Sequence, residues 1–118
     1  MGRCARKIPN TYQYNHLARI CSVSTFSEIS YTSSDGLALY ARDYAAHSGP
    51  ARLPVICIHG LTRNSGDFDE LAPWIASQGR RVIAVDVRGR GKSARDPNPA
   101  HYQPLVYAGD IVKLAHDL

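Results

Sequence analysis

The sequence lacks any long apolar run. No stretch approaches the roughly 20 consecutive apolar residues that a helix needs to cross a bilayer, although 44% of the 118 residues are hydrophobic. The N-terminus is basic, but Pro9, Asn10, Asn15 and His16 stand where a signal peptide would carry its apolar core. These absences argue against a membrane protein and against export by a signal peptide.

Cysteine is scarce, and its placement is irregular. The three cysteines are odd in number and unevenly spaced, at Cys4, Cys21 and Cys57. They form neither a disulfide framework nor a metal-binding pattern, and the histidines show no metal-ligand spacing. We therefore expect no metal, no cofactor and a reduced, cytoplasmic compartment.

Acidic residues are missing from the N-terminal segment. Residues 1–24 contain four basic side chains and no acidic one, whereas residues 25–118 contain ten of each sign, so the net charge of +4 arises entirely in the segment 1–24. Four charges are a weak signal for nucleic acid or anionic lipid, and we expect neither as a partner. We interpret residues 1–24 as a basic, disordered leader and residues 25–118 as the folded part.

Alternating residues predict an antiparallel hairpin over residues 26–45. Phe26, Ile29 and Tyr31 lie among polar residues, and a second alternating segment covers residues 37–44. Asp35-Gly36 between the two segments is a tight-turn signal.

Two continuous apolar runs follow, over residues 53–58 and 82–85. Continuous runs are typical of strands buried on both faces. Between them, Asn64 or Ser65 can cap a helix that Gly79 ends. The apolar face of this helix is predicted to contain Phe68, Leu71, Trp74 and Ile75. A strand, a crossover helix and a second buried strand form a βαβ unit with parallel pairing.

The last part of the sequence predicts a long loop over residues 86–102 and a helix that Pro104 begins. Its apolar face is predicted to contain Leu105, Ala108, Ile111, Val112, Ala115 and Leu118. Such a helix should lead to another parallel strand, and none follows in this sequence. We expect an unpaired sheet edge, which can self-associate.

Four segments resemble the α/β-hydrolase family in order and spacing. Residues 26–45 resemble its first two strands, and Val55-Ile-Cys-Ile-His-Gly-Leu61 resembles its third strand and oxyanion turn. Val82-Ile-Ala-Val-Asp-Val-Arg-Gly-Arg-Gly-Lys-Ser93 resembles its fourth strand and the following loop, and residues 105–118 resemble the helix that leads to the nucleophile strand. His-Gly alone is weak, but His-Gly followed by Asp-Val-Arg-Gly-x-Gly-x-Ser is specific.

This resemblance implies the N-terminal portion of a three-layer αβα fold of the α/β class, with a hairpin, a parallel βαβ unit and a trailing helix. It implies an oxyanion-hole or substrate-binding role for His59, Gly60 and Leu61. In that role the Leu61 N–H is a donor, Gly60 lets substrate approach, and His59 supports the turn without being the triad histidine. It implies loop-ordering roles for Asp86, Arg88, Gly89, Gly91 and Ser93, while Arg90 stands where many relatives carry histidine.

The nucleophile motif of the family is absent. No Gly-x-Ser-x-Gly occurs, and Gly91-Lys92-Ser93-Ala94-Arg95 fails at its last position and follows the wrong strand. Because the acid and base follow the nucleophile in this family, we assign no catalytic residue. The resemblance implies a hydrolase of a small-molecule ester, lactone or carbon–carbon bond with a serine nucleophile. We expect this incomplete domain to be inactive alone.

Two other functions stay open. A non-catalytic fragment could act as an interaction module through its open sheet edge. A strand adapted to solvent exposure would carry polar substitutions, however, and Val55–Ile58 has none. Gly89–Ser93 also resembles part of a phosphate-binding loop. That motif requires glycine where Asp86 stands and a helix directly after the lysine, where Pro97 and Pro99 follow.

Overall fold

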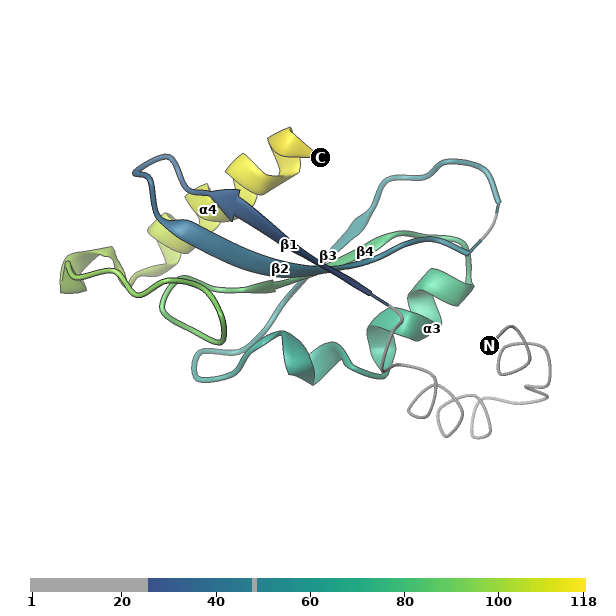
Figure 1. The fold of residues 1–118 in the computed structure, drawn as a ribbon, viewed down its shortest axis with the longest axis horizontal. Helices are drawn as coiled ribbons and strands as arrows, with labels where there is room; N and C mark the ends of the chain where they lie inside the picture. The colour runs from purple at the N-terminus through teal and green to yellow at the C-terminus, as the bar shows by residue number, and fades with distance from the viewer. Residues whose placement is uncertain (1–25, 48) are drawn as a thin grey trace.

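Four strands form one mixed sheet (Figure 1). The structure, a computed structural model, describes residues 26–47 and 49–118, so the segment 1–24 lies outside the described residues. The strands are β1 (Ser27–Thr32), β2 (Ala38–Tyr44), β3 (Val55–Ile58) and β4 (Val82–Asp86), in the order β1-β2-β4-β3. β1 pairs antiparallel with β2 and β3 pairs parallel with β4, as predicted. The sequence did not predict the antiparallel pairing of β2 with β4.

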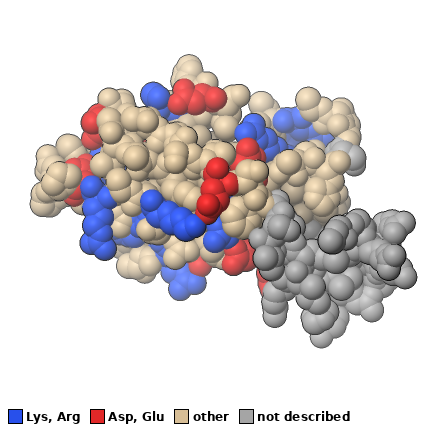
Figure 2. Space-filling view, viewed as in Figure 1, with Lys and Arg blue, Asp and Glu red and all other residues tan. Residues whose placement is uncertain are grey.

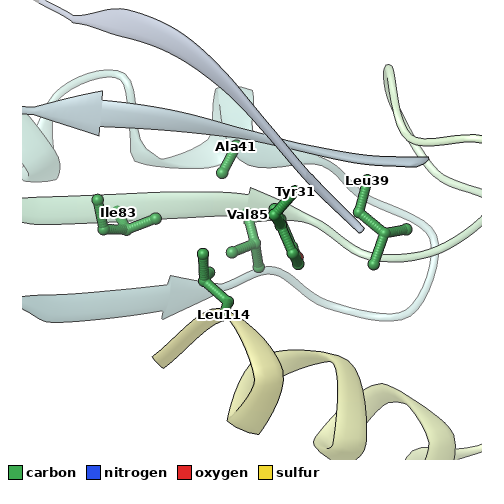
Figure 3. Close-up of a cluster of buried hydrophobic side chains, with 6 residues drawn as sticks. All are labelled: Tyr31, Leu39, Ala41, Ile83, Val85 and Leu114. Carbon is green, nitrogen blue, oxygen red and sulfur yellow. The ribbon is translucent and has the colours of Figure 1, made fainter. Parts of the chain in front are cut away.

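Helices cover both faces of this sheet. Figure 1 shows α3 (Leu71–Ser77) and α4 (Pro104–Asp117) on opposite sides. Because side chains alternate along a strand, Ile83 and Val85 face α4, whereas Val82 and Ala84 face α3. Figure 3 shows Leu114 of α4 pointing toward the strands. The α/β class and the three-layer arrangement are thus confirmed. No helix among the described residues is long and apolar enough to cross a membrane.

β4 is the central strand, and all of its residues are buried, as its apolar sequence predicted. The same prediction for residues 53–58 is wrong in part. The strand begins only at Val55, Leu53 is exposed, and the Ile58 side chain is 52% exposed. Ile58 is exposed because, among the described residues, β3 pairs only with β4 and lies at the edge of the sheet.

The helix predicted between β3 and β4 is divided in two. Asn64 caps a 3₁₀ helix, η2 (Ser65–Phe68), by accepting the Gly66 N–H at 2.8 Å, and α3 follows. Gly79 has φ +94° and follows the end of α3, as predicted.

The predicted apolar face of this helix is half wrong. Phe68 and Ile75 pack on the core beside Ala72 and Ala76, but Leu71 and Trp74 are exposed. A 3₁₀ helix has three residues per turn, whereas an α-helix has 3.6. Positions before and after the break therefore do not follow one helical period.

α4 begins at Pro104, as predicted, but its inner face differs from the predicted one. Asp110 and Leu114 are buried, and Ile111 packs partly against the core. Of the predicted apolar face, Leu105, Ala108, Val112, Ala115 and Leu118 are instead exposed. The helix is turned this way because Asp110 accepts hydrogen bonds from the buried Arg88.

Two leucines of α4 test this orientation. Leu114→Ala is expected to lower the free energy of unfolding by about 2–5 kcal/mol, because it leaves a cavity against β4. Leu105→Ala, at an 80% exposed position of the same helix, should change it by less than about 0.5 kcal/mol. Urea unfolding followed by circular dichroism measures both. The reverse ranking would show that α4 docks through the face predicted from its apolar residues.

Candidate functional site

The segments that resemble an active-site region meet at one edge of the sheet. β3 and β4 are parallel neighbours, so the turn after β3 and the loop after β4 leave the sheet at the same edge. Ligands of open α/β sheets bind at this carboxyl edge. The structure brings His59, Gly60 and Leu61 beside the segment 86–93, through the contacts described below.

His59 joins the turn to the loop. The ring is buried, its Nε2 lies 3.0 Å from the Val87 nitrogen, and its Nδ1 lies 2.7 Å from the Gly60 oxygen. Because the Val87 N–H can only donate, Nε2 is the acceptor, and Nδ1 carries the proton that it donates to Gly60. Both ring nitrogens are engaged with backbone, so His59 has no free nitrogen for proton transfer.

The Leu61 N–H points out of the turn. The Gly60 carbonyl accepts hydrogen bonds from His59 Nδ1 and from the Arg63 N–H at 3.1 Å. In a trans peptide the C=O and the following N–H point in opposite directions, so the Leu61 N–H faces away from both. Within the described residues no acceptor contacts it, and the Leu61 side chain is 74% exposed. This N–H is free to donate to a bound oxygen.

Arg90 holds the same turn from the other side. Its Nε–H donates to the Leu61 carbonyl oxygen at 2.7 Å. The sequence assigned Arg90 no role. The signal that could have found it is its place between Gly89 and Gly91, in a loop that leaves β4 beside the turn.

The Asp86 carboxylate anchors the start of the loop. It is buried and accepts the Ser65 N–H at 2.7 Å and the Lys92 N–H at 2.9 Å. Ser93 Oγ donates to the Asp86 carbonyl at 2.6 Å and accepts the Tyr40 N–H at 2.9 Å. These bonds tie the loop to η2 and to β2.

Two glycines of this loop have left-handed backbones. Gly89 has φ +79° and Gly91 has φ +52°, a region in which other residues are strained. A Cβ at Gly89 would collide with the Tyr102 ring, and a Cβ at Gly91 would collide with the Asp86 carboxylate. Both positions therefore require glycine for the tight path of the loop.

The contacts of the loop argue against phosphate binding. The anion that the Lys92 N–H meets is the carboxylate of Asp86, and the Lys92 ammonium pairs with Glu28 at 2.6 Å. The next helical element is η3 (Pro99–His101), a short 3₁₀ helix, rather than a helix that begins after the lysine. A nucleotide would have to replace these internal contacts.

Arg88 lies at the centre of a buried ion cluster. Its side chain is 1% exposed. Nε and Nη2 donate to Asp110 at 3.0 and 2.7 Å, Nη1 and Nη2 donate to Asp35 at 2.9 and 3.0 Å, and Nη1 donates to Asp96 at 2.6 Å. All five N–H donors of the guanidinium are therefore used.

This cluster shifts the ionisation of its members. The hydrogen bonds that Arg88 donates to Asp110, and then those to Asp35, raise the pKa of Arg88 further above its usual value. Hydrogen bonds from Arg88 and then Ser33 hold the pKa of Asp35 well below its usual range. The Asn98 N–H, and then His101 and Arg88, lower the pKa of Asp96.

An open cavity of about 330 Å³ adjoins the cluster, lined by Asp35, Arg88 and His101 together with residues of α4 that include Asp110. Among the described residues, Asp35, Asp96 and His101 bring possible ligand atoms within 4.8 Å of one another. A cation there would compete with Arg88, which already bonds both carboxylates. We interpret the group as an ion-pair network, and the absence of a metal stays a prediction.

The ion cluster generates a stability prediction. At neutral pH Arg88→Met should lower the free energy of unfolding by about 3–5 kcal/mol, because three carboxylates lose their partner. The pKa values of Asp35 and Asp96 are lowered in the folded chain. Their stabilising contribution is therefore present above the unfolded-state pKa of about 3.9 and is lost as pH falls through the folded-state values.

The deficit of the Arg88→Met variant should accordingly shrink between about pH 5 and pH 2. Urea unfolding at a series of pH values measures it. Arg52→Met, at an exposed arginine, is the matched control and should stay within about 0.5 kcal/mol of the parent chain. Equal stability of the two variants at neutral pH would contradict the role given to the cluster.

Known proteins are similar to this chain in sequence and in fold. The family model for the alpha/beta hydrolase fold matches residues 54–118. A non-heme chloroperoxidase of Streptomyces lividans is 36% identical over 87 residues, which are 74% of this chain and 30% of that protein.

Two solved structures are similar in fold and sequence. An alpha/beta hydrolase from Novosphingobium aromaticivorans has a TM-score of 0.74 and 39% identity, over 80% of this chain and 32% of that one. An esterase from Exiguobacterium antarcticum has a TM-score of 0.65 and 27% identity, over 75% of this chain and 30% of that one. The chain spans about a third of the length of these proteins. By this match of sequence and fold, the chain belongs to the α/β-hydrolase family.

Proposed function

We propose that this chain is the part of an α/β-hydrolase that supplies an oxyanion-hole donor. The parent reaction is hydrolysis of an ester, lactone or carbon–carbon bond in a small molecule, through a serine nucleophile. The observation that carries the proposal is the outward-facing Leu61 N–H, whose direction follows from the hydrogen bond of His59 to Gly60. The esterase of similar fold supports an ester as the substrate class.

The chemistry requires such a donor. Attack on a carbonyl carbon places negative charge on the carbonyl oxygen, and a fixed N–H stabilises that charge with no reorganisation during the reaction. One donor of this kind is worth about 3–4 kcal/mol of transition-state stabilisation. A Cβ at Gly60 would meet only the Arg63 side chain, at 3.7 Å. The described residues thus leave room beside Gly60, which supports our proposal that a substrate approaches there.

The sequence shows no motif for the remaining catalytic groups. The sequence contains no Gly-x-Ser-x-Gly, and His59 uses both ring nitrogens for backbone contacts. We propose that the nucleophile, the acid and the base come from residues outside this sequence, and that the chain alone has no hydrolase turnover. We further propose a cytoplasmic location, which the free thiol of Cys57 supports.

A small-molecule substrate fits the charge distribution better than nucleic acid. In the view of Figure 2, basic and acidic side chains lie beside one another. Sequence-independent binding of nucleic acid needs a continuous basic surface that can neutralise several phosphates. The charges in this view are mixed instead, which supports our expectation that nucleic acid is not a partner.

A chimeric esterase tests the donor. Residues 26–118 of this chain replace the matching segment of the Exiguobacterium antarcticum esterase, and the product is assayed with p-nitrophenyl acetate. Leu61→Pro, which removes the N–H, should lower kcat by about 10²–10³-fold. Leu61→Ala keeps the N–H and removes only an exposed side chain, so it should retain the activity of the chimera.

Two results would contradict the proposal. One is equal activity of the Leu61→Pro and Leu61→Ala chimeras, with circular dichroism showing that both are folded. The other is serine-dependent hydrolysis of the same ester by the purified 118-residue chain, for which we expect no rate above that of buffer.

One observation favours a second role, as an interaction module. Ile58 is 52% exposed on β3, and only β4 pairs with that strand within the described residues. An apolar, unpaired strand edge is a template for another strand. We propose that two copies of the chain associate through this edge.

Sedimentation over a range of concentrations measures this association. Ile58→Lys should weaken the dimer at least about tenfold, because a charge on an edge strand opposes pairing. Thr32→Lys, at an exposed position of the opposite edge strand β1, should leave it unchanged. A parent chain that stays monomeric at every concentration would end this second proposal.

A further inference from the structure

Two hydrogen bonds cross between the turn after β3 and the loop after β4, and the loop donates both of them. The loop backbone donates from Val87 to His59 Nε2 at 3.0 Å. The loop side chain of Arg90 donates from Nε to the Leu61 carbonyl at 2.7 Å. Each segment thus offers one side chain to the backbone of the other.

We propose that Arg90 is a positioning residue that fixes the direction of the Leu61 N–H, an inference that rests on the proposed function. Leu61 lies between two planar peptide units. His59 holds the first unit through the Gly60 carbonyl, and Arg90 holds the second through the Leu61 carbonyl. With both planes held, rotation about the Leu61 backbone is restricted, and the N–H keeps its outward direction.

The backbone of Arg90 is fixed well enough for this task. The Arg90 N–H donates to the Val87 carbonyl at 2.8 Å, and the Arg90 carbonyl accepts the Ser93 N–H at 3.0 Å. The neighbouring glycines allow a turn so tight that Gly91 lies against the Asp86 carboxylate. The Cα position from which the Arg90 side chain extends is therefore well defined.

The contact with Leu61 is not a by-product of an ion pair. In the part of the chain that the structure describes, no carboxylate lies within ion-pair distance of Arg90. The side chain is half-buried, and within the described residues its hydrogen-bond partner is the Leu61 oxygen, at 2.7 Å. The position of the Arg90 side chain is therefore explained by its hydrogen bond to the turn.

Three variants separate the hydrogen bond from the charge. Arg90→Gln places an amide nitrogen at the position of Nε, after the same three side-chain carbons, without the charge. Arg90→Lys keeps the charge but puts a methylene where Nε was. Arg90→Met keeps a stem of similar length without donor or charge. A positioning hydrogen bond predicts that glutamine rescues and that lysine does not.

Amide hydrogen exchange in the ¹⁵N-labelled 118-residue chain is the first measurement. The Arg63 N–H closes the turn by donating to Gly60, so its exchange rate reports how often the turn opens. Arg90→Met and Arg90→Lys should raise that rate about tenfold, and Arg90→Gln should stay within about threefold of the parent chain. The control is Arg80→Met, because Arg80 donates to the Leu53 carbonyl at 3.0 Å before β3 begins.

The esterase chimera supplies the functional measurement. Arg90→Met should lower kcat about tenfold or more, with little change in KM, because a displaced donor affects mainly the transition state. Arg90→Gln should restore most of this loss, and Arg80→Met should have no such effect.

Two outcomes would overturn the role of Arg90: an Arg63 exchange rate that Arg90→Met leaves unchanged, or rescue by lysine with failure of glutamine. If the unmodified chimera is folded but inactive, the proposed function fails. The exchange experiment on the 118-residue chain then still decides whether Arg90 holds the turn.

Discussion

The guanidinium of Arg88, enclosed by three carboxylates, determines where the loop after β4 can lie. Asp35 belongs to the hairpin turn, Asp96 to the loop itself and Asp110 to α4. A guanidinium removed from water is costly unless its donors are satisfied, and here all five N–H groups have acceptors. The cluster is therefore stable only when the hairpin, the loop and α4 are assembled together.

The loop is held from both faces of the sheet. By strand alternation Asp86 follows Val82 and Ala84 on the face that α3 covers, where it binds the Ser65 N–H of η2. Arg88, two residues later, is bonded to Asp110 of α4 on the opposite face. Since both anchors are buried, the path of the residues that follow is largely decided before Arg90 makes any contact.

Local signals in the sequence predicted much of the fold. The hairpin and its turn at Gly36, the buried β4, the helix start at Pro104 and the helix end at Gly79 depend on residues close in sequence. The inner face of α4 could not be predicted in this way. It is decided by Arg88, 22 residues from Asp110, while apolar residues such as Leu105 lie outside.

The candidate site also combines features that the sequence could predict with features that depend on distant contacts. The meeting of the His59 turn with the segment 86–93 could be predicted, because parallel neighbouring strands end at the same edge. The sequence also indicated that Arg88 orders a loop, but not which carboxylates surround it. The contact of Arg90 with Leu61 was not predictable, because spacing along the chain does not show where a long side chain ends.

Two classes of contact thus have different roles in this site. Buried charges, which include Asp86 and Arg88, decide where the loop lies, and we expect their removal to destabilise the fold. The solvent-exposed bond from Arg90 to Leu61 contributes little to stability, since a hydrogen bond of this kind is worth about 1 kcal/mol net. Yet it acts on the peptide next to the free Leu61 N–H, where a small rotation changes the direction of the donor. A fold built in this way can vary the residue at position 90, and so adjust the turn that we propose as an oxyanion donor, without disturbing the assembly of the sheet.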